Sequence, residues 1–155
     1  MMGKKYKGFS LIEILVVVAL IVILATITIV AINPAKNFRD TRNAQRSADI
    51  MQILNAVTQY TSEQNHSISN LTFGGVAIST DCDDPTNIVT GATPLSAFED
   101  LLVDEYIVSI PRDPLQPAGG DTGYQICITG TSGRVQVMAP LAATDGKTAP
   151  LVVKR

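Results

Sequence analysis

The feature that most constrains this chain is a long apolar run close to its start. Between residues 14 and 32 no side chain is charged, and Thr26 and Thr28 are the only polar ones. Extended back to Phe9, the stretch has 24 residues. As an α-helix it is about 36 Å long, which is enough to cross a hydrocarbon core of about 30 Å. The run therefore predicts a membrane-spanning helix.

A basic segment precedes the run, with Lys4, Lys5 and Lys7 and no acid. This order is typical of an export signal, but an ordinary secretory signal has a shorter apolar core, of about 7–15 residues, and ends at an Ala-x-Ala-like site. Here the run ends in Ala-Ile-Asn-Pro-Ala at residues 31–35, a poor match to that site. We therefore expect the helix to stay in the membrane.

Charges on the two sides of the run give opposing signals for its orientation. The leader lysines and the amino terminus favour an N-terminus in the cytoplasm. Four basic residues follow the run and favour the opposite orientation: Lys36, Arg39, Arg42 and Arg46. We expect the N-terminus inside, because the first segment of a chain usually sets its topology.

Glu13 is the one acid in residues 9–32. A carboxylate in a membrane costs a few kcal/mol at the bilayer centre and less near an edge. Two explanations are open from the residues alone. The carboxylate can lie at the interface and reach headgroups or water, or it can meet a positive partner inside an assembly, which offsets its desolvation.

The residues around Glu13 form a recognisable pattern. Residues 7–13, Lys-Gly-Phe-Ser-Leu-Ile-Glu, followed by a long aliphatic run, resemble the leader of type IV prepilins and type II secretion pseudopilins. The resemblance implies that a prepilin peptidase cuts between Gly8 and Phe9 on the cytoplasmic side and that the new amino group of Phe9 is methylated. It also implies that Glu13 pairs with the N-terminal amine of a neighbouring subunit.

The function implied by this resemblance is that of a structural filament subunit, not an enzyme, with no cofactor. Its expected partners are copies of itself, related minor pilins, the peptidase, the cytoplasmic membrane, and an assembly platform with its motor. We expect a single-pass protein of the cytoplasmic membrane, with its head outside, that then enters a cell-surface or periplasmic filament. The sequence does not separate a pilus from a secretion pseudopilus or a competence filament.

Three other functions are considered: a DNA-uptake pilin, an adhesive pilin and a simple membrane-anchored extracytoplasmic binding domain. Residues 65–155 carry ten acidic and five basic side chains. An acidic head repels phosphate, so we expect no nucleic acid there. An anchored enzyme is disfavoured because the only histidine is His66, which we expect to be a solvated loop residue, and no nucleophile or nucleotide motif is present.

The expected fold is α+β and pilin-like, with a long hydrophobic N-terminal helix that continues into an amphipathic helix packed on a small antiparallel β-sheet head. We divide the chain into a cleaved basic leader (1–8), a transmembrane and assembly helix (9–32), the amphipathic half of the helix (33–64), and a globular head (65–155). At Asn33-Pro34 the helix either bends or restarts, with Asn33 as N-cap and Pro34 in its first position.

The second helical segment, residues 35–63, has one apolar stripe at helical spacing. Its members are Ile50, Ile53, Leu54, Val57 and Tyr60. A weaker extension of the stripe lies upstream at Phe38, Ala44, Ala48 and Met51. The arginines at 39, 42 and 46 alternate with acids and amides, a weak footprint for DNA or acidic lipid, and we expect them to form a solvated or inter-subunit face.

The head is expected to be loop-rich over residues 65–100, with a short helix at 96–103 capped by Ser96. Alternating residues at 123–129 and 134–139, joined by a Gly-containing turn, predict a β-hairpin. Residues 151–153 can add an edge strand. A turn with the sequence Ile-Pro-x-Asp-Pro at residues 110–114 resembles the head of major pseudopilins and related pilins.

Cys82 and Cys127 are the only cysteines. Outside the cytoplasm they can form one disulfide, closing a loop of about 46 residues, a contribution of about 4 kcal/mol in the chain-entropy model. The alternative is two buried free cysteines.

Some pilin-like proteins hold calcium in a head loop, and two acidic clusters offer oxygen ligands here. The candidates are Asp113 with Asp121, and Asp81 with Asp83 and Asp84. Neither spacing fits the D-x-[DN]-x-[DN]-G loop. We expect solvated loops and no metal.

Overall fold

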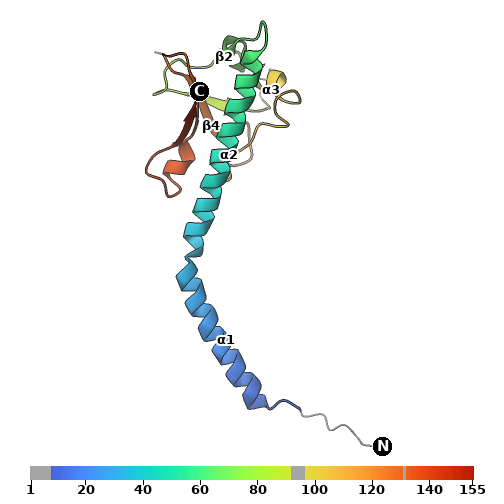
Figure 1. The fold of residues 1–155 in the computed structure, drawn as a ribbon, viewed down its shortest axis with the longest axis vertical. Coiled ribbons are helices and arrows are strands. Elements are labelled where there is room, and N and C mark those ends of the chain that lie inside the picture. The colour runs from blue at the N-terminus through green and yellow to red at the C-terminus, as the bar shows by residue number, and fades with distance from the viewer. Residues whose placement is uncertain (1–7, 92–96, 131) are drawn as a thin grey trace, which may run out of the picture. The chain divides into compact units, whose positions relative to one another are not determined.

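The structure is a computed structural model that describes residues 8–91, 97–130 and 132–155 (Figure 1). Its order of elements confirms the expected α+β, pilin-like fold, because a long apolar N-terminal helix is followed by a second helix and then by small antiparallel sheets. The chain divides into two compact units, Met1–Phe38 and Arg39–Arg155.

The first unit contains α1 (Leu11–Ile32), which holds the apolar run. The hydroxyls of Thr26 and Thr28 each donate to a backbone carbonyl one turn earlier, at 2.8 Å. Both threonine hydroxyls therefore find their hydrogen-bond acceptors within α1 itself. This is what a membrane interior, which has no water, requires.

Between the two helices, Asn33 has the left-handed backbone angle φ +48° and ends α1. The next helix, α2 (Pro34–Ser62), begins at once, and the Lys36 N–H donates to Asn33 Oδ1 at 3.3 Å. The helix restarts, with Asn33 as its cap and Pro34 in the first position, where a missing N–H costs nothing.

In the second unit, α2 buries the apolar stripe that its periodicity predicts. These residues are Ile50, Ile53, Leu54, Val57 and Tyr60. The weaker upstream extension is wrong, since Phe38 is 66% and Met51 44% exposed and Ala44 and Ala48 are exposed too. The same face is continued instead by two polar residues, Asn43 and Arg46, both of which are buried.

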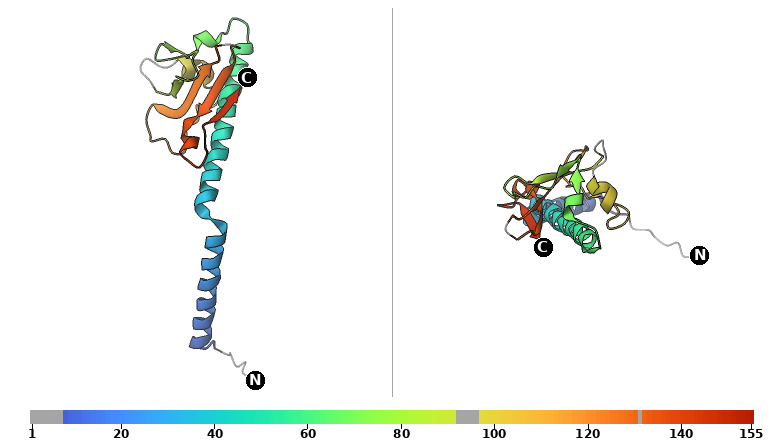
Figure 2. Two further views of the ribbon diagram at one scale, coloured as in Figure 1. Left: turned by 90° about the vertical axis from the view of Figure 1, so that its left-hand side faces the viewer. Right: turned by 90° about the horizontal axis from the view of Figure 1, so that it is seen from above.

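The main sheet has four antiparallel strands in the order β3 (Thr86–Val89), β4 (Asp121–Ile128), β5 (Val135–Ala139) and β6 (Leu151–Lys154). It lies beside α2 (Figure 2). The predicted hairpin and edge strand are confirmed by β4, β5 and β6, with Ile128 opposite Val135 at the turn. Tyr124 and Ile126 face the stripe of α2 in one apolar core.

The region expected to be loop-rich contains more structure than its composition suggests. It holds β3, a two-stranded ribbon of β1 (Thr72–Phe73) and β2 (Val76–Ala77), and a short 3-10 helix, η1 (Ile68–Asn70). A second 3-10 helix, η2 (Pro140–Ala143), follows β5.

The short helix expected at 96–103 is α3 (Ala97–Leu102). The expected cap, Ser96, lies outside the described residues. The carboxylate of Glu99 accepts a hydrogen bond from the Gly91 N–H at 2.8 Å, so it ties α3 to the loop before it.

Candidate functional site

The candidate processing site lies directly before α1. Phe9 is 78% exposed, and, its chain neighbours aside, no atom of the described residues lies within 4 Å of the position that a Cβ on Gly8 would take. Residues 8–10 have no regular secondary structure. An accessible, non-helical segment is what a peptidase needs in order to reach the backbone.

Glu13 lies in the first turn of α1, and its N–H donates to the Ser10 carbonyl at 3.1 Å. A negative charge here is favoured by the partial positive charge of a helix N-terminus. The side chain is exposed, and nothing in residues 8–91, 97–130 or 132–155 forms an ion pair with it. It is therefore available to a group outside the described chain.

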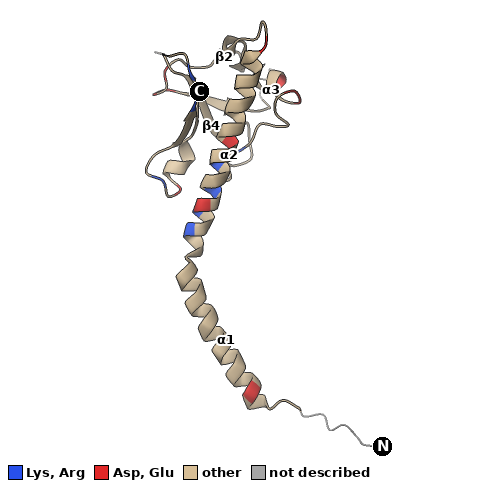
Figure 3. Ribbon diagram, in the orientation of Figure 1, with Lys and Arg blue, Asp and Glu red and all other residues tan. Residues whose placement is uncertain are grey.

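The surface of α1 is apolar on every side. Its large apolar side chains are 47–84% exposed, and the described chain buries none of them. By length and composition, this is one helix able to cross a membrane. After Glu13 the helix has no charged residue, whereas charged residues of both signs gather on the first half of α2 (Figure 3). Such a surface needs lipid or other apolar helices around it.

Residues 3–29 match the family model described as the prokaryotic N-terminal methylation motif. This motif is the leader of type IV pilins and pseudopilins. The chain carries a pilin-like leader. The match includes Gly8, Phe9 and Glu13 and most of α1, and the head lies outside it. No curated protein and no solved structure matches the chain.

Behind the pilin-like leader, the head contains a buried ionic cluster that sequence reasoning missed. Arg46, with no exposed side-chain surface, donates to both carboxylate oxygens of Asp113 at 2.6 and 3.0 Å. Its remaining Nη1 donates to Asn43 Oδ1 and to Asp145 Oδ2, each at 2.8 Å. Asp145 also accepts two hydrogen bonds from Arg42, at 2.6 and 2.5 Å.

Charges in this ionic cluster are matched, with two guanidinium groups against two carboxylates. Hydrogen bonds from Arg42 and then Arg46 hold the pKa of Asp145 below its usual value against the opposing effect of burial. The hydrogen bond with Asp113 raises the pKa of Arg46. Both shifts favour the charged forms of Asp145 and Arg46, as a buried pair requires in order to offset its desolvation.

The cluster corrects the expected role of the arginines on α2. Arg46 is enclosed within the head, so it forms no solvated or inter-subunit face, and Arg42 is half-buried in its ion pair with Asp145. Of the three arginines on α2, Arg39 is the one whose side chain is exposed. A sequence signal for this did exist, since Asn43 and Arg46 precede Ile50 by seven and four positions and so share its face.

A second polar contact extends the cluster toward the sheet. The Tyr124 hydroxyl donates to Asp49 Oδ2 at 2.6 Å. Burial, and then this carboxylate, raises the pKa of Tyr124 well above its usual range. Burial also raises the pKa of Asp49. The phenol is thus a fixed donor, which links α2 to β4.

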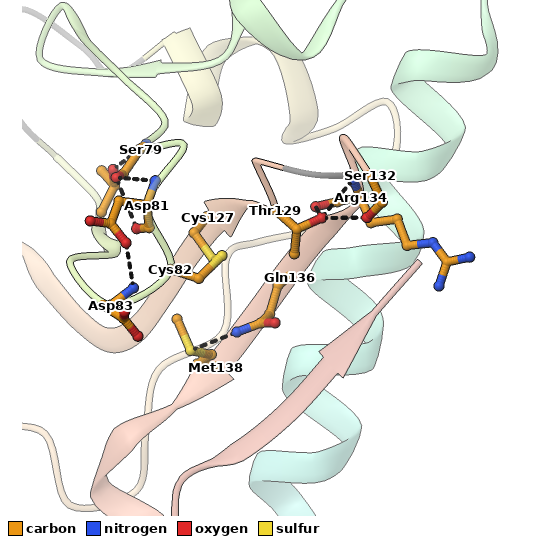
Figure 4. The surroundings of a disulfide bond; sticks show 11 residues. Ser79, Asp81, Cys82, Asp83, Cys127, Thr129, Ser132, Arg134, Gln136 and Met138 are labelled. Atoms are coloured by element: carbon orange, nitrogen blue, oxygen red, sulfur yellow. Dashed lines mark hydrogen bonds between the residues drawn. A yellow bond between two sulfur atoms is a disulfide. The ribbon is translucent and has the colours of Figure 1, made fainter.

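Cys82 and Cys127 are joined in a disulfide, with 5.3 Å between their Cα atoms (Figure 4). Cys127 points to the opposite face of β4 from Tyr124 and Ile126, yet it is fully buried. The loop that carries Cys82 covers it, and Gln136 of β5 lies opposite it in the register. The bond therefore fastens the loop before β3 onto the outer face of the sheet.

His66 lies in a loop, as expected, but it is only partly solvated, with 34% of its side chain exposed. Its ring stacks on Tyr60 with 4.4 Å between the ring centroids, and its Nδ1 lies 3.5 Å from a Glu63 carboxylate oxygen. The stacking places the ring against Tyr60, a core residue near the C-terminal end of α2.

Proposed function

We propose that this protein is a structural subunit of a type IV pilus-like or type II secretion pseudopilus filament. In this proposal a prepilin peptidase cuts between Gly8 and Phe9, the new amino group is methylated, and the mature chain polymerises through α1. The observation that carries it is the methylation motif, which covers most of a helix that is apolar on every side and has one acid in its first turn.

Cleavage changes the electrostatics at the start of α1. It removes Lys4, Lys5 and Lys7 and creates a positive amine at Phe9. A carboxylate in a low-dielectric environment gains most from a compact positive partner. Pairing of Glu13 with the amine of a neighbouring copy satisfies both charges and sets the axial stagger between the two helices.

The apolar remainder of α1 can pack against other helices, but these contacts alone do not fix the register between two helices. Lipid tails are as apolar as these side chains, so moving α1 from lipid into a bundle brings little hydrophobic gain, and van der Waals packing holds the helices together. The one charged pair then defines the register. In this proposal the energy for extraction from the membrane comes from a separate motor.

The head lies outside the cytoplasm in this proposal, where an oxidising environment lets its disulfide persist.

Intact-mass and N-terminal analysis tests the proposal. The protein is recovered from membranes and from sheared cell-surface or periplasmic material of cells that contain a prepilin peptidase. We expect a precursor in the first fraction and a chain that begins at methylated Phe9 in the second. A chain in both fractions that retains residues 1–8 contradicts the proposal.

A further inference from the structure

The loop before β4 closes on a single side-chain cation, Arg112. Its Nη1 donates to the main-chain carbonyls of Pro117, at 3.1 Å, and Asp121, at 2.5 Å, and its Nη2 donates to that of Gly119. Three carbonyl dipoles of one loop therefore point at one guanidinium group.

The planar fork of arginine is suited to carboxylates and phosphates, but the three partners of Arg112 here are neutral backbone carbonyls. Converging backbone carbonyls are instead a common part of calcium sites. Three carbonyl groups that converge repel one another, and a positive charge at their centre offsets this repulsion. Arg112, which lies just before the loop, supplies that charge here.

A calcium ion does not fit beside it. Both oxygens of Asp113 are taken by Arg46, and Oδ1 also accepts from the Leu115 N–H at 2.8 Å. Oδ1 of Asp121 accepts from the Gly123 N–H at 2.8 Å. Among the described residues, no three His, Cys, Asp or Glu side chains are grouped as metal ligands. The guanidinium group would also repel a divalent cation from the carbonyls.

The two adjacent residues Arg112 and Asp113 contact different parts of the head. Arg112 binds forward to residues 117–121, while Asp113 binds back to α2 and donates its N–H to the Thr122 carbonyl at 2.9 Å. A Cβ on Gly123 would lie 2.9 Å from Cβ of Asp113, so glycine is needed for this approach.

We propose that Arg112 is the fixed cation of the loop at residues 114–121, and that the head consequently closes this loop without calcium. The proposal concerns the head alone and does not depend on filament formation.

Thermal unfolding of the full chain in detergent tests it, with EDTA and with about 10 mM Ca²⁺, well above the dissociation constants of extracellular calcium modules. We expect the wild-type melting temperature to be the same in both. Arg112→Gln removes the charge and is expected to lower the melting temperature by about 5 °C. Arg112→Lys keeps the charge and should lose less.

Arg134→Gln is the matched control, because it removes one positive charge from an exposed arginine of the head whose side chain makes no contact of this kind with the described residues. Three results overturn the proposal: a wild-type melting temperature that rises with calcium, an Arg112→Gln variant as stable as Arg134→Gln, or equal losses for Arg112→Gln and Arg112→Lys.

Discussion

Arg46 and Asp113 form a two-point ion pair, at 2.6 and 3.0 Å, in which neither side chain is exposed. The pair joins the middle of α2 to the turn before β4, 67 positions further along the chain. The pair holds α2 against the turn that contains Asp113. The apolar stripe of α2 packs on the sheet. The ion pair is thus the polar counterpart of the core.

Asp113→Asn is expected to destabilise the head by about 3 kcal/mol, because it leaves a buried guanidinium group short of one counter-charge. This loss of stability is at the lower end of the range for a broken buried ion pair, because Asp145 still accepts a hydrogen bond from Arg46 at 2.8 Å. Denaturant unfolding of the full chain in detergent measures it. The same change at the exposed Asp84 should have little effect, and equal stability of the two variants contradicts the role of the pair.

Local patterns predicted the elements of this fold well. The stripe from Ile50 to Tyr60 is set by the helical period, and the hairpin of β4 and β5 by alternation on two sides of a glycine-containing turn. Neither depends on a distant part of the chain. At Pro34 the sequence predicted an interruption but left a bend and a restart open, and the structure shows the restart.

Features that depend on distant partners were missed. The strand β3 has only four residues, and it is stabilised by pairing with β4, whose residues lie more than 30 positions further along the chain. An arginine such as Arg46 is expected at the surface from the sequence, because its buried partners, Asp113 and Asp145, approach it only in the folded chain. In the first half of α2, apolar residues such as Phe38 were expected to be buried, but the buried face there is polar.

Acid should weaken the head through Asp145. Its pKa is held below the ordinary value by Arg42 and Arg46, so the unfolded chain binds this proton more tightly than the folded one. The stabilisation is complete above the unfolded pKa, about 3.9, and is lost as the pH falls below it. Asp49, whose pKa is raised, acts in the opposite direction, so a difference between two variants is the proper measurement.

We therefore expect the gap in denaturant midpoint between wild type and Asp145→Asn to be large at pH 7 and to shrink at pH 3. A gap of the same size at both values means that the ionisation of Asp145 contributes nothing to stability.

Reduction of the disulfide should lower the stability of the head by about 4 kcal/mol in the chain-entropy model, since the bond spans 45 positions. Melting curves with and without reductant measure the change. A Cys82→Ala/Cys127→Ala variant should melt at the same temperature in both conditions. Two free thiols detected by labelling of protein taken from the cell envelope would show that the bond does not form there.

Gly8→Asp should block processing and leave a full-length precursor in the membrane. Gly8 lies in open space, so the change acts on recognition by the peptidase and not on folding. Gly119→Asp is the matched control, because a Cβ there also meets nothing within 4 Å and the residue lies in the head. Immunoblots of membrane fractions separate precursor from mature chain. Normal processing of Gly8→Asp is incompatible with cleavage after this residue.

Glu13→Leu should leave membrane insertion intact and reduce filament yield by about tenfold or more, the effect of losing at least about 1.4 kcal/mol per contact. Insertion is retained because leucine extends the apolar surface of α1. Glu13→Asp keeps the charge with a shorter reach, so it should lose less. Both are measured as sheared filament against total membrane protein.

A mixed-expression experiment distinguishes a pair between copies from a contact within one chain. A Glu13→Leu subunit keeps its own Phe9 amine, so it can still bind the Glu13 of a wild-type neighbour. Tagged Glu13→Leu subunits should therefore enter wild-type filaments although they form few filaments alone. If the carboxylate acted only within its own chain, wild-type copies would not rescue the variant, and its exclusion from mixed filaments would rule out the pairing between neighbours.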